Sequence, residues 1–209
     1  MSRKTDPFAV EPTPELILRA YRAGIFPMAE SAEAEDLFWV SPQQRGIIPL
    51  DAIHLSRSLR KTLKSHPYSV RTDTDFDSVI EGCATAGTER ETTWINAEIR
   101  RLYRELFRRG SVHTVEVWDG PALVGGLYGV SIGAAFFGES MLHRKTDCSK
   151  IAMAHLLERL RAGNYRLCDT QFVTDHLRTF GGIEIAREDY ELRLAEALRF
   201  EADWAAIDR

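Results

Sequence analysis

Two strand-like segments near the middle of this chain are joined by a very short connection, Asp119-Gly120-Pro121. Residues 114–117 before it are rich in β-branched side chains, and residues 122–128 after it are mostly apolar or glycine. Parallel neighbours need a crossover of a dozen or more residues, so a turn this short can join only antiparallel strands. The sequence therefore predicts a β-hairpin, and the fold has to contain at least one antiparallel pair.

Helix-like and strand-like segments occur on both sides of this hairpin. Helical patterns predict helices over residues 12–23, 57–64, 75–85, 97–109, 150–162 and 189–200. Strand-like runs occupy residues 38–40, 46–49, 68–70, 134–138 and 165–171. Residues 25–28 are predicted to form an apolar loop, and residues 29–36 an exposed acidic segment. This mixture, with strands and helices alternating in the later part, predicts an α+β fold.

The length of 209 residues is sufficient for one full core together with a small appended unit. The first part of the chain is too poor in apolar length to fold alone. We therefore expect a small N-terminal α/β unit over residues 1–46, packed on a main domain over residues 47–209.

Several classes of protein are disfavoured by what the sequence lacks. Its apolar runs are far shorter than the roughly 20 residues of a membrane span, and its first residues lack the apolar core of a secretory signal. Cys83, Cys148 and Cys168 are odd in number and widely separated, which fits neither a disulfide framework nor a zinc site. The six histidines show no HExxH grouping. We expect a cytoplasmic protein with no metal and no other cofactor.

Residues 165–171 contain the polar pair that draws most attention. If this segment is a strand, Tyr165, Leu167, Asp169 and Gln171 lie on one face, because side chains alternate along a strand. The carboxylate and the carboxamide are then about 7 Å apart and could hold and orient a nucleophile's proton. An exposed polar strand end is an equally good interpretation of these residues alone.

A second candidate site is a basic helix. Arg57, Arg60, Lys61 and Lys64 recur at three- and four-residue steps, so a helix gathers them on one face, and residues 52–72 contain no acid. Such a face could neutralise several phosphates of a nucleic acid. A simple solvated basic face is the more common explanation of this pattern.

Two further residues could bind a ligand. Glu139 ends a strand within Gly138-Glu139-Ser140, where it could bind a cation or an ammonium group, or only cap a turn. Trp94 precedes a helix, where it could stack on a base or lie at the edge of the core. The glycine-rich residues 125–129 match no phosphate-binding loop and are better explained by a bulge or close strand packing.

Several short motifs resemble one known family, the leucyl/phenylalanyl-tRNA–protein transferases. They are Tyr21-Arg22-Ala23-Gly24-Ile25-Phe26-Pro27, Trp39-Val40-Ser41-Pro42, His54-Leu55-Ser56-Arg57-Ser58, Thr93-Trp94-Ile95, Glu116-Val117-Trp118, Val124-Gly125-Gly126-Leu127-Tyr128-Gly129-Val130, Phe137-Gly138-Glu139-Ser140-Met141, and Asp169-Thr170-Gln171 with Asp175-His176. The motifs occur in the family's order from Tyr21 to Tyr190, which covers most of the chain.

The resemblance implies a bacterial cytoplasmic enzyme that moves Leu or Phe, with Met as a further candidate, from tRNA to a protein. The acceptor would be the α-amine of an N-terminal Lys or Arg, and the product would be marked for N-degron proteolysis. The family fold implied is a small N-terminal unit followed by a GNAT-like acyltransferase domain. This chain lacks the (Q/R)xxGx(G/A) turn that acyl-coenzyme A enzymes of that fold use, so aminoacyl-tRNA is the better donor. The expected partners are aminoacyl-tRNA and the acceptor protein, with no membrane and a monomeric chain.

By resemblance, Asp169 and Gln171 are the catalytic residues for aminolysis of the tRNA ester. Asp169 would orient Gln171, whose carbonyl oxygen would draw the proton of the attacking amine. Because an amide is not a useful base, the proton could instead pass through the terminal ribose hydroxyl or water.

The resemblance also implies substrate-binding residues. The pocket for the donor side chain would be formed by Leu127, Phe136, Met141, Met153, Leu156 and Leu160. The same spacing on the helix also fits an ordinary core. Trp94 would stack on the terminal adenine, and Met28 stands where related proteins often carry a second tryptophan. Glu139 would shape the site or meet the basic peptide, and Arg57, Arg60, Lys61 and Lys64 would contact tRNA phosphates.

Three rival functions remain for the sequence alone. The first is an acyl-coenzyme A N-acyltransferase on the same fold, and the second is a transferase that places Leu on N-terminal Asp or Glu. The third is a module that binds a tRNA end or a peptide without catalysing a reaction.

Overall fold

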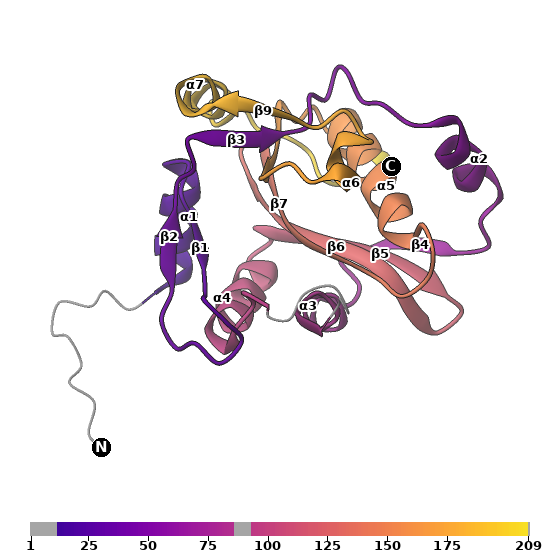
Figure 1. Ribbon diagram of the computed structural model, residues 1–209, viewed down its shortest axis with the longest axis horizontal. Coiled ribbons are helices and arrows are strands. Elements are labelled where there is room, and N and C mark those ends of the chain that lie inside the picture. The colour runs from indigo at the N-terminus through magenta and orange to yellow at the C-terminus, as the bar shows by residue number, and fades with distance from the viewer. Residues whose placement is uncertain (1–11, 86–92, 209) are drawn as a thin grey trace, which may run out of the picture.

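The computed structural model describes residues 12–85 and 93–208, and the elements in this part of the chain are drawn in Figure 1. The helices are α1 (Pro14–Arg22), α2 (Arg57–Ser65), α3 (Phe76–Thr85), α4 (Ala97–Arg108), α5 (Cys148–Ala162), α6 (Asp175–Arg178), α7 (Arg187–Ala197) and the 3₁₀ turn η1 (Ala206–Asp208). The strands are β1 (Phe26–Met28), β2 (Phe38–Val40), β3 (Gln44–Ile47), β4 (Ser69–Thr72), β5 (Val112–Asp119), β6 (Ala122–Ile132), β7 (Ala135–His143), β8 (Leu167–Gln171) and β9 (Ile183–Ala186). None of these helices is long and apolar enough to cross a membrane.

A mixed seven-stranded sheet is the centre of the fold, with the strand order β4-β5-β6-β7-β8-β3-β9. Adjacent strands in this sheet run antiparallel, except for β7 and β8, which are parallel. The predicted hairpin is confirmed as β5 and β6, with Asp119 opposite Ala122. The helix α5 makes the crossover between the two parallel strands, as such a connection requires. The predicted α+β class is therefore confirmed.

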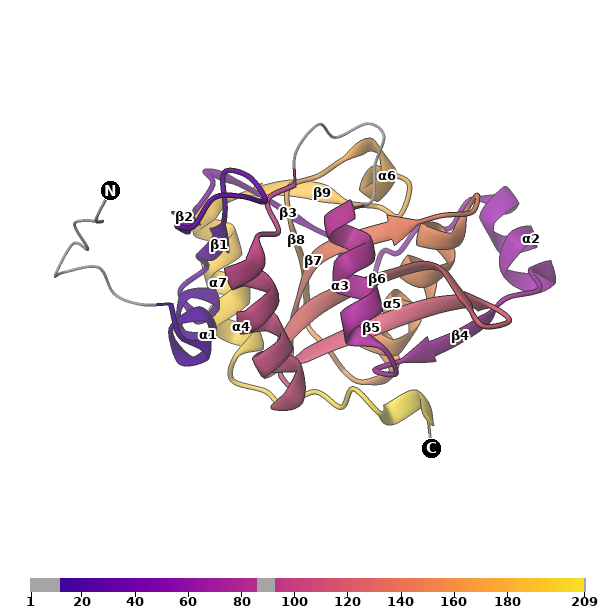
Figure 2. The same ribbon diagram turned by 90° about the horizontal axis from the view of Figure 1, so that it is seen from below.

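Helices cover both faces of the sheet, and each face has its own apolar cluster. Figures 1 and 2 show α3 and α4 on one side and α5 on the other. The first cluster joins the sheet to α1, α3, α4 and α7 through buried side chains such as Ile17, Tyr21, Val79, Leu102 and Tyr190. The second cluster joins the sheet to α2, α5 and α6 through Leu59, Leu156, Leu157 and Leu177 among others.

The N-terminal elements pack on the sheet and share the first cluster. Residues 25–28 are not the predicted loop, because residues 26–28 form β1, which pairs antiparallel with β2. The predicted exposed segment 29–36 is mostly accessible, but its first residue, Ala29, is buried in the first cluster. The predicted domain boundary after residue 46 falls inside β3, a strand of the large sheet.

Glycines in β6 allow close packing at two points, in agreement with the sequence interpretation. A Cβ atom on Gly125 would lie 2.5 Å from the Cβ of Cys148, at the start of α5. A Cβ atom on Gly129 would lie 2.4 Å from the carbonyl oxygen of Phe137. Real Cβ atoms do not approach other atoms so closely, so only glycine fits these positions.

Candidate active site

The strands β7 and β8 separate at the point where the candidate polar residues lie. Their pairing is limited to three residue pairs, and the last of these joins Phe137 to Asp169. Both strands continue beyond this point, β7 to His143 and β8 to Gln171. Glu139 and Gln171 therefore lie on two strands that have just stopped hydrogen-bonding to each other.

The carboxylate of Asp169 is fully buried and accepts hydrogen bonds from four N–H or O–H groups. Arg45 of β3 donates from Nε to Oδ1 at 2.9 Å and from Nη2 to Oδ2 at 2.6 Å. The hydroxyl of Tyr190 on α7 donates to Oδ2 at 2.7 Å, and the backbone N–H of Gln171 donates to Oδ1 at 2.8 Å. Because a carboxylate has about four acceptor positions, Asp169 is a fixed anchor.

Arg45 supplies the positive charge that balances the carboxylate of Asp169, and its side chain is 1 % exposed. Its Nη1 donates to the carbonyl of Gly24 at 3.0 Å, and its guanidinium carbon lies 4.6 and 4.5 Å from the ring centres of Phe26 and Tyr190. Burial acts against the charged form, but the carboxylate of Asp169 outweighs it and raises the pKa of Arg45. A buried ion pair is tolerated only with such complete hydrogen bonding.

Gln171 has a backbone conformation that non-glycine residues rarely adopt. Its φ is 61°, and the N–H of Phe172 donates to the carbonyl of Thr170 at 2.6 Å, which forms a γ-turn centred on Gln171. Such a conformation typically costs about 1–3 kcal/mol and persists where its surroundings enforce it. Here the bond from the Gln171 N–H to Asp169 is one of the contacts that enforce it.

A β-bulge places Glu139 at the site. Tyr128 of β6 faces Ser140 and Gly129 faces Gly138, so Glu139 is an extra residue on β7 without a partner on β6. A bulge changes the direction in which a side chain points, and bulges are frequent next to active sites. The strand alternation that the sequence suggests is broken at this residue.

The side chain of Glu139 collects hydrogen bonds from three elements. The hydroxyl of Tyr21 on α1 donates to Oε1 at 2.6 Å, and Nε2 of Gln171 donates to the same oxygen at 2.9 Å. The hydroxyl of Tyr103 on α4 donates to Oε2 at 3.2 Å, and the two tyrosine hydroxyls also contact each other. Burial raises the pKa of Glu139 to about 7, and the tyrosine hydrogen bonds act against this rise.

The six apolar residues predicted for the donor pocket lie in one place, the second apolar cluster. Five of them are buried, namely Leu127, Phe136, Met153, Leu156 and Leu160. Met141 is only partly buried and lies two residues beyond Glu139 on β7. Burial of this kind is also what an ordinary core shows.

Met28 and Trp94 lie on the opposite side of the sheet from that cluster. Both are partly buried and pack against the first cluster. The side chain of Asn96 caps α4 by accepting from the N–H of Ile99, and it donates to the carbonyl of Ala34 at 2.8 Å. This bond attaches the connection between β1 and β2 to the start of α4, next to Trp94.

The predicted basic helix is confirmed as α2, with Ser56 as its N-cap. Arg57, Arg60, Lys61 and Lys64 are all exposed, and Leu59 is buried against the second cluster. None of the four cations forms an ion pair within the described residues. The helix lies at the end of the molecule opposite β1 and β2 (Figures 1 and 2).

Comparison with known families identifies what this arrangement belongs to. The family model "Leucyl/phenylalanyl-tRNA protein transferase" matches residues 47–195, and the model of its N-terminal domain matches residues 11–43. The chain belongs to the leucyl/phenylalanyl-tRNA protein transferase family.

Two curated members of the leucyl/phenylalanyl-tRNA protein transferase family are closely similar along nearly their whole length. The protein of this name from Paramagnetospirillum magneticum is 54% identical over 197 residues, which cover 94% of this chain and 93% of that protein. The one from Afipia carboxidovorans is 53% identical over 202 residues, which cover 97% and 89%.

In this transferase family member, Asp169 and Glu139 contact different parts of Gln171. Asp169 binds the backbone N–H of Gln171, whereas the side-chain amide of Gln171 is bound by Glu139. The expected shared face is wrong for Tyr165, which precedes β8 and packs in the second cluster, while Leu167 packs in the first.

Sequence reasoning missed four residues that hold the candidate transferase site together: Arg45, Tyr190, Tyr21 and Tyr103. Tyr103 and Tyr190 lie on the buried faces of α4 and α7, where the sequence does not distinguish them from ordinary core residues. The predicted strand over residues 46–49 begins after Arg45, so the sequence did not show that this arginine is buried and paired.

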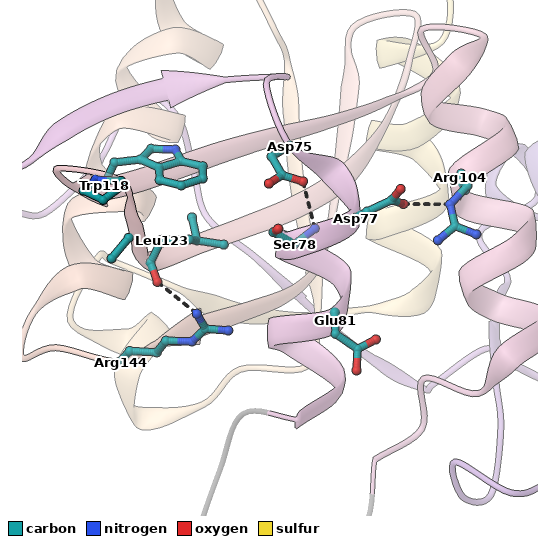
Figure 3. A pocket seen from close by; sticks show the side chains of 10 residues that line it. Asp75, Asp77, Ser78, Glu81, Arg104, Trp118, Leu123 and Arg144 are labelled. Atoms are coloured by element: carbon teal, nitrogen blue, oxygen red, sulfur yellow. Dashed lines mark hydrogen bonds and ion pairs between the residues drawn. The ribbon is translucent and has the colours of Figure 1, made fainter.

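A separate surface hollow lies beside α3 and the turn of the β5–β6 hairpin, and no predicted site residue lines it. Figure 3 shows Asp77 turned toward Arg104, and Arg144 turned toward the carbonyl of Leu123. Asp75 accepts from the N–H of Ser78 at the start of α3. These charged groups of the hollow are therefore used in structural contacts.

Proposed function

We propose that this protein transfers Leu or Phe from aminoacyl-tRNA to the α-amine of proteins that begin with Lys or Arg. Such a product would be marked for N-degron proteolysis. The proposal is supported by family membership and by one observation: Gln171 is fixed in a γ-turn with its side chain oriented by Glu139. A strained residue held by a buried network is a common feature of active sites.

The orientation of Gln171 favours a role for its carbonyl oxygen. Its Nε2 donates to the carboxylate of Glu139, so the oxygen is the end of the amide that is turned away from that carboxylate. In the proposed reaction this oxygen accepts a hydrogen bond from the neutral α-amine and aligns it with the ester carbonyl. The nitrogen–carbon bond forms, the ester carbon–oxygen bond breaks, and the proton of the amine passes to the ribose oxygen that leaves.

The two substrates would approach from different parts of the site. The donor side chain would enter the second apolar cluster near Met141, where β7 and β8 are no longer paired. Leucine and methionine side chains can adapt to both an aliphatic and an aromatic group. The terminal adenine would stack on Trp94 beside Met28, and the phosphates would contact the exposed cations of α2. The carboxylate of Glu139 would favour a cationic acceptor.

A transfer assay with several donors and acceptors tests the proposal. Labelled Leu-tRNA, Phe-tRNA and Met-tRNA are incubated with the protein and peptides that begin with Arg, Lys, Asp or Glu. We expect labelled product with Leu or Phe as donor and with Arg or Lys as acceptor. Product on Asp or Glu peptides alone, or transfer from acyl-coenzyme A in place of tRNA, would replace the proposal. Binding of tRNA without any product would overturn it.

Variants of one residue test the proposed role of the amide. Gln171→Ala should lower kcat by about 100-fold, the scale of a positioned proton-handling group. It should leave the affinity for aminoacyl-tRNA nearly unchanged. Gln44→Ala is the matched control, because Gln44 is exposed on the neighbouring strand β3. Equal activity of the two variants would remove Gln171 from the mechanism.

A further inference from the structure

The last part of the chain is bound along α5, and we call residues 201–208 the C-terminal strap. The N–H of Asp203 donates to the carbonyl of Gly163 at 2.9 Å, and a Cβ atom on Gly163 would lie 2.3 Å from the carbonyl oxygen of Asp203. The strap lies beyond residue 195, where the match to the family model ends.

Arg159 of α5 fixes the strap at two points. Its Nη1 donates to the carbonyl of Trp204 at 2.6 Å, and its two terminal nitrogens bind the two carboxylate oxygens of Asp208 at 2.6 and 2.7 Å. Its guanidinium also lies 5.1 Å from the ring centre of Trp204. A bidentate arginine–carboxylate pair sets geometry as well as contributing energy, so the strap has one defined position.

In this position the indole of Trp204 stacks with two other rings. The ring of His113 lies 4.3 Å from it at an interplanar angle of 16°, and the ring of Phe136 lies 5.6 Å from it at 7°. His113 is itself fixed, because its Nδ1 lies 2.8 Å from the carboxylate of Asp73. The Nε1 of Trp204 is buried without a hydrogen-bond partner in the described residues, so stacking positions this ring.

Phe136 is confined on its other sides as well. A Cβ atom on Gly129 would lie 2.5 Å from the ring of Phe136, so the ring occupies the space that the glycine leaves free. The ring of Tyr165 contacts it edge-on, with centres 6.3 Å apart. Phe136 is completely buried. The indole of Trp204 adds to this enclosure from outside the sheet and its crossover helix.

We infer that Trp204 is a positioning residue that determines the donor side chain the enzyme prefers. This inference rests on the proposed function, in which Phe136 forms a wall of the pocket for Leu or Phe. The stacked indole restricts the movement of the Phe136 ring, which belongs to the same apolar cluster as Met153 and Leu156. The pocket thus keeps a limited depth.

The direction of the effect follows from this geometry. Removal of the indole leaves space behind Phe136, and a neighbouring side chain relaxes into such space in part. The wall then moves outward and the pocket becomes larger, which favours the Phe side chain over Leu. A change of about one methylene in an apolar pocket alters discrimination by on the order of tenfold.

Transfer to a peptide that begins with Arg is measured with Leu-tRNA and with Phe-tRNA as separate donors. The ratio of kcat/KM for Phe over Leu should rise on the order of tenfold in Trp204→Ala and by less in Trp204→Phe. Ile207→Ala is the control, because Ile207 belongs to the same strap but is 41% exposed and has no ring to stack. Its ratio should equal that of the unaltered chain.

Each result separates the inference from the proposed function. A purely structural role would lower the melting temperature and reduce transfer of both donors equally, and this result would overturn the inference alone. If Trp204→Ala does not fold, the same ratio is measured in Trp204→Phe and in Asp208→Asn. The second variant weakens the contact of Arg159 with the strap. No transfer from either donor by the unaltered chain would overturn the proposed function and this inference with it.

Discussion

Arg45 and Asp169 form an ion pair in which both side chains are almost inaccessible to water. We expect Asp169→Ala to lower the free energy of unfolding by about 3–5 kcal/mol, because it leaves the guanidinium buried without a counter-charge. Replacing both residues with Leu removes both charges, so the double variant should be more stable than the sum of the single effects predicts. Urea unfolding followed by circular dichroism measures these differences.

An exposed arginine–aspartate pair is the control. Arg104 and Asp77 are 2.7 Å apart, but their side chains are 41% and 64% exposed. Asp77→Ala should change the free energy of unfolding by at most about 1 kcal/mol. Equal effects of Asp169→Ala and Asp77→Ala would show that the buried pair has no special importance. Loss of activity in Asp169→Ala is accordingly a less specific test of catalysis than loss in Gln171→Ala.

Glu139 gives the stability a pH dependence whose sign is fixed. Its pKa is about 7 in the folded chain and about 4.5 in the unfolded chain, so the folded state binds an extra proton between these values. The stabilisation from this group is complete below pH 4.5 and is lost as the pH rises through 7. Between pH 5 and 8, the free energy of unfolding should therefore fall by on the order of 3 kcal/mol less in Glu139→Gln than in the unaltered chain.

Denaturant unfolding of both proteins at several pH values measures this slope. The two proteins differ only at residue 139, so contributions from the rest of the chain cancel in the difference. Parallel curves would mean that Glu139 titrates in the folded chain as it does in the unfolded chain, and they would contradict the expectation.

Single residues differ in how well the sequence reveals them. Asp169 and Gln171 were visible because both end a short strand-like segment with polar groups. Their partner Arg45 was not, because a three- or four-residue strand has no periodicity that marks an arginine as buried. The contact between Glu139 and Gln171 depends on a bulge and a left-handed residue, and neither has a local signature in the sequence.

At the level of elements, the exposed cations of the helix α2 predict how tRNA binding depends on salt. Neutralising one of its exposed cations, as in Arg60→Gln, should weaken binding and reduce the slope of log K against log salt by about 0.7–0.9. The fourfold variant of Arg57, Arg60, Lys61 and Lys64 should reduce it by about three units. Binding of tRNA at several salt concentrations measures the slope.

The control for α2 is Arg19→Gln. Arg19 is also an exposed cation on a helix, but α1 lies at the other end of the molecule (Figure 1). An unchanged slope in the fourfold variant, or an equal change in Arg19→Gln, would place the tRNA elsewhere.

Long periodic elements were predicted well, whereas several short ones were missed. The helices α3, α4 and α5 were found within about two residues, since each repeats its apolar positions over several turns. The strands β1 and β9 and the helix α6 are only three or four residues long and were missed. In β1 the central residue is Pro27, which argues against a strand unless the strand lies at an edge.

At the scale of the whole molecule, the strand order could not be read from the sequence. The strand β3 comes early in the chain, yet it lies between β8 and β9, with Gly46 opposite Gln171. This placement brings Arg45 to Asp169, and it depends on pairing between residues more than 120 positions apart. The candidate site thus exists only after the N-terminal and C-terminal parts of the chain have combined.

Because the site needs both the N-terminal and the C-terminal parts of the chain, we expect the N-terminal elements and the large sheet to unfold together. Tyr21 of α1 is completely buried, its ring lies 4.9 Å from that of Phe137 on β7, and its hydroxyl binds Glu139. We expect the slowest-exchanging amides of α1 and of β5–β7 to report the same opening free energy in hydrogen exchange, with the same dependence on urea. Tyr21→Ala should lower both values equally, by about 3–5 kcal/mol for loss of a large buried ring. If α1 opens at lower urea than the sheet, the N-terminal unit is a separate folding unit, and the ion pair of Arg45 alone does not couple the two parts.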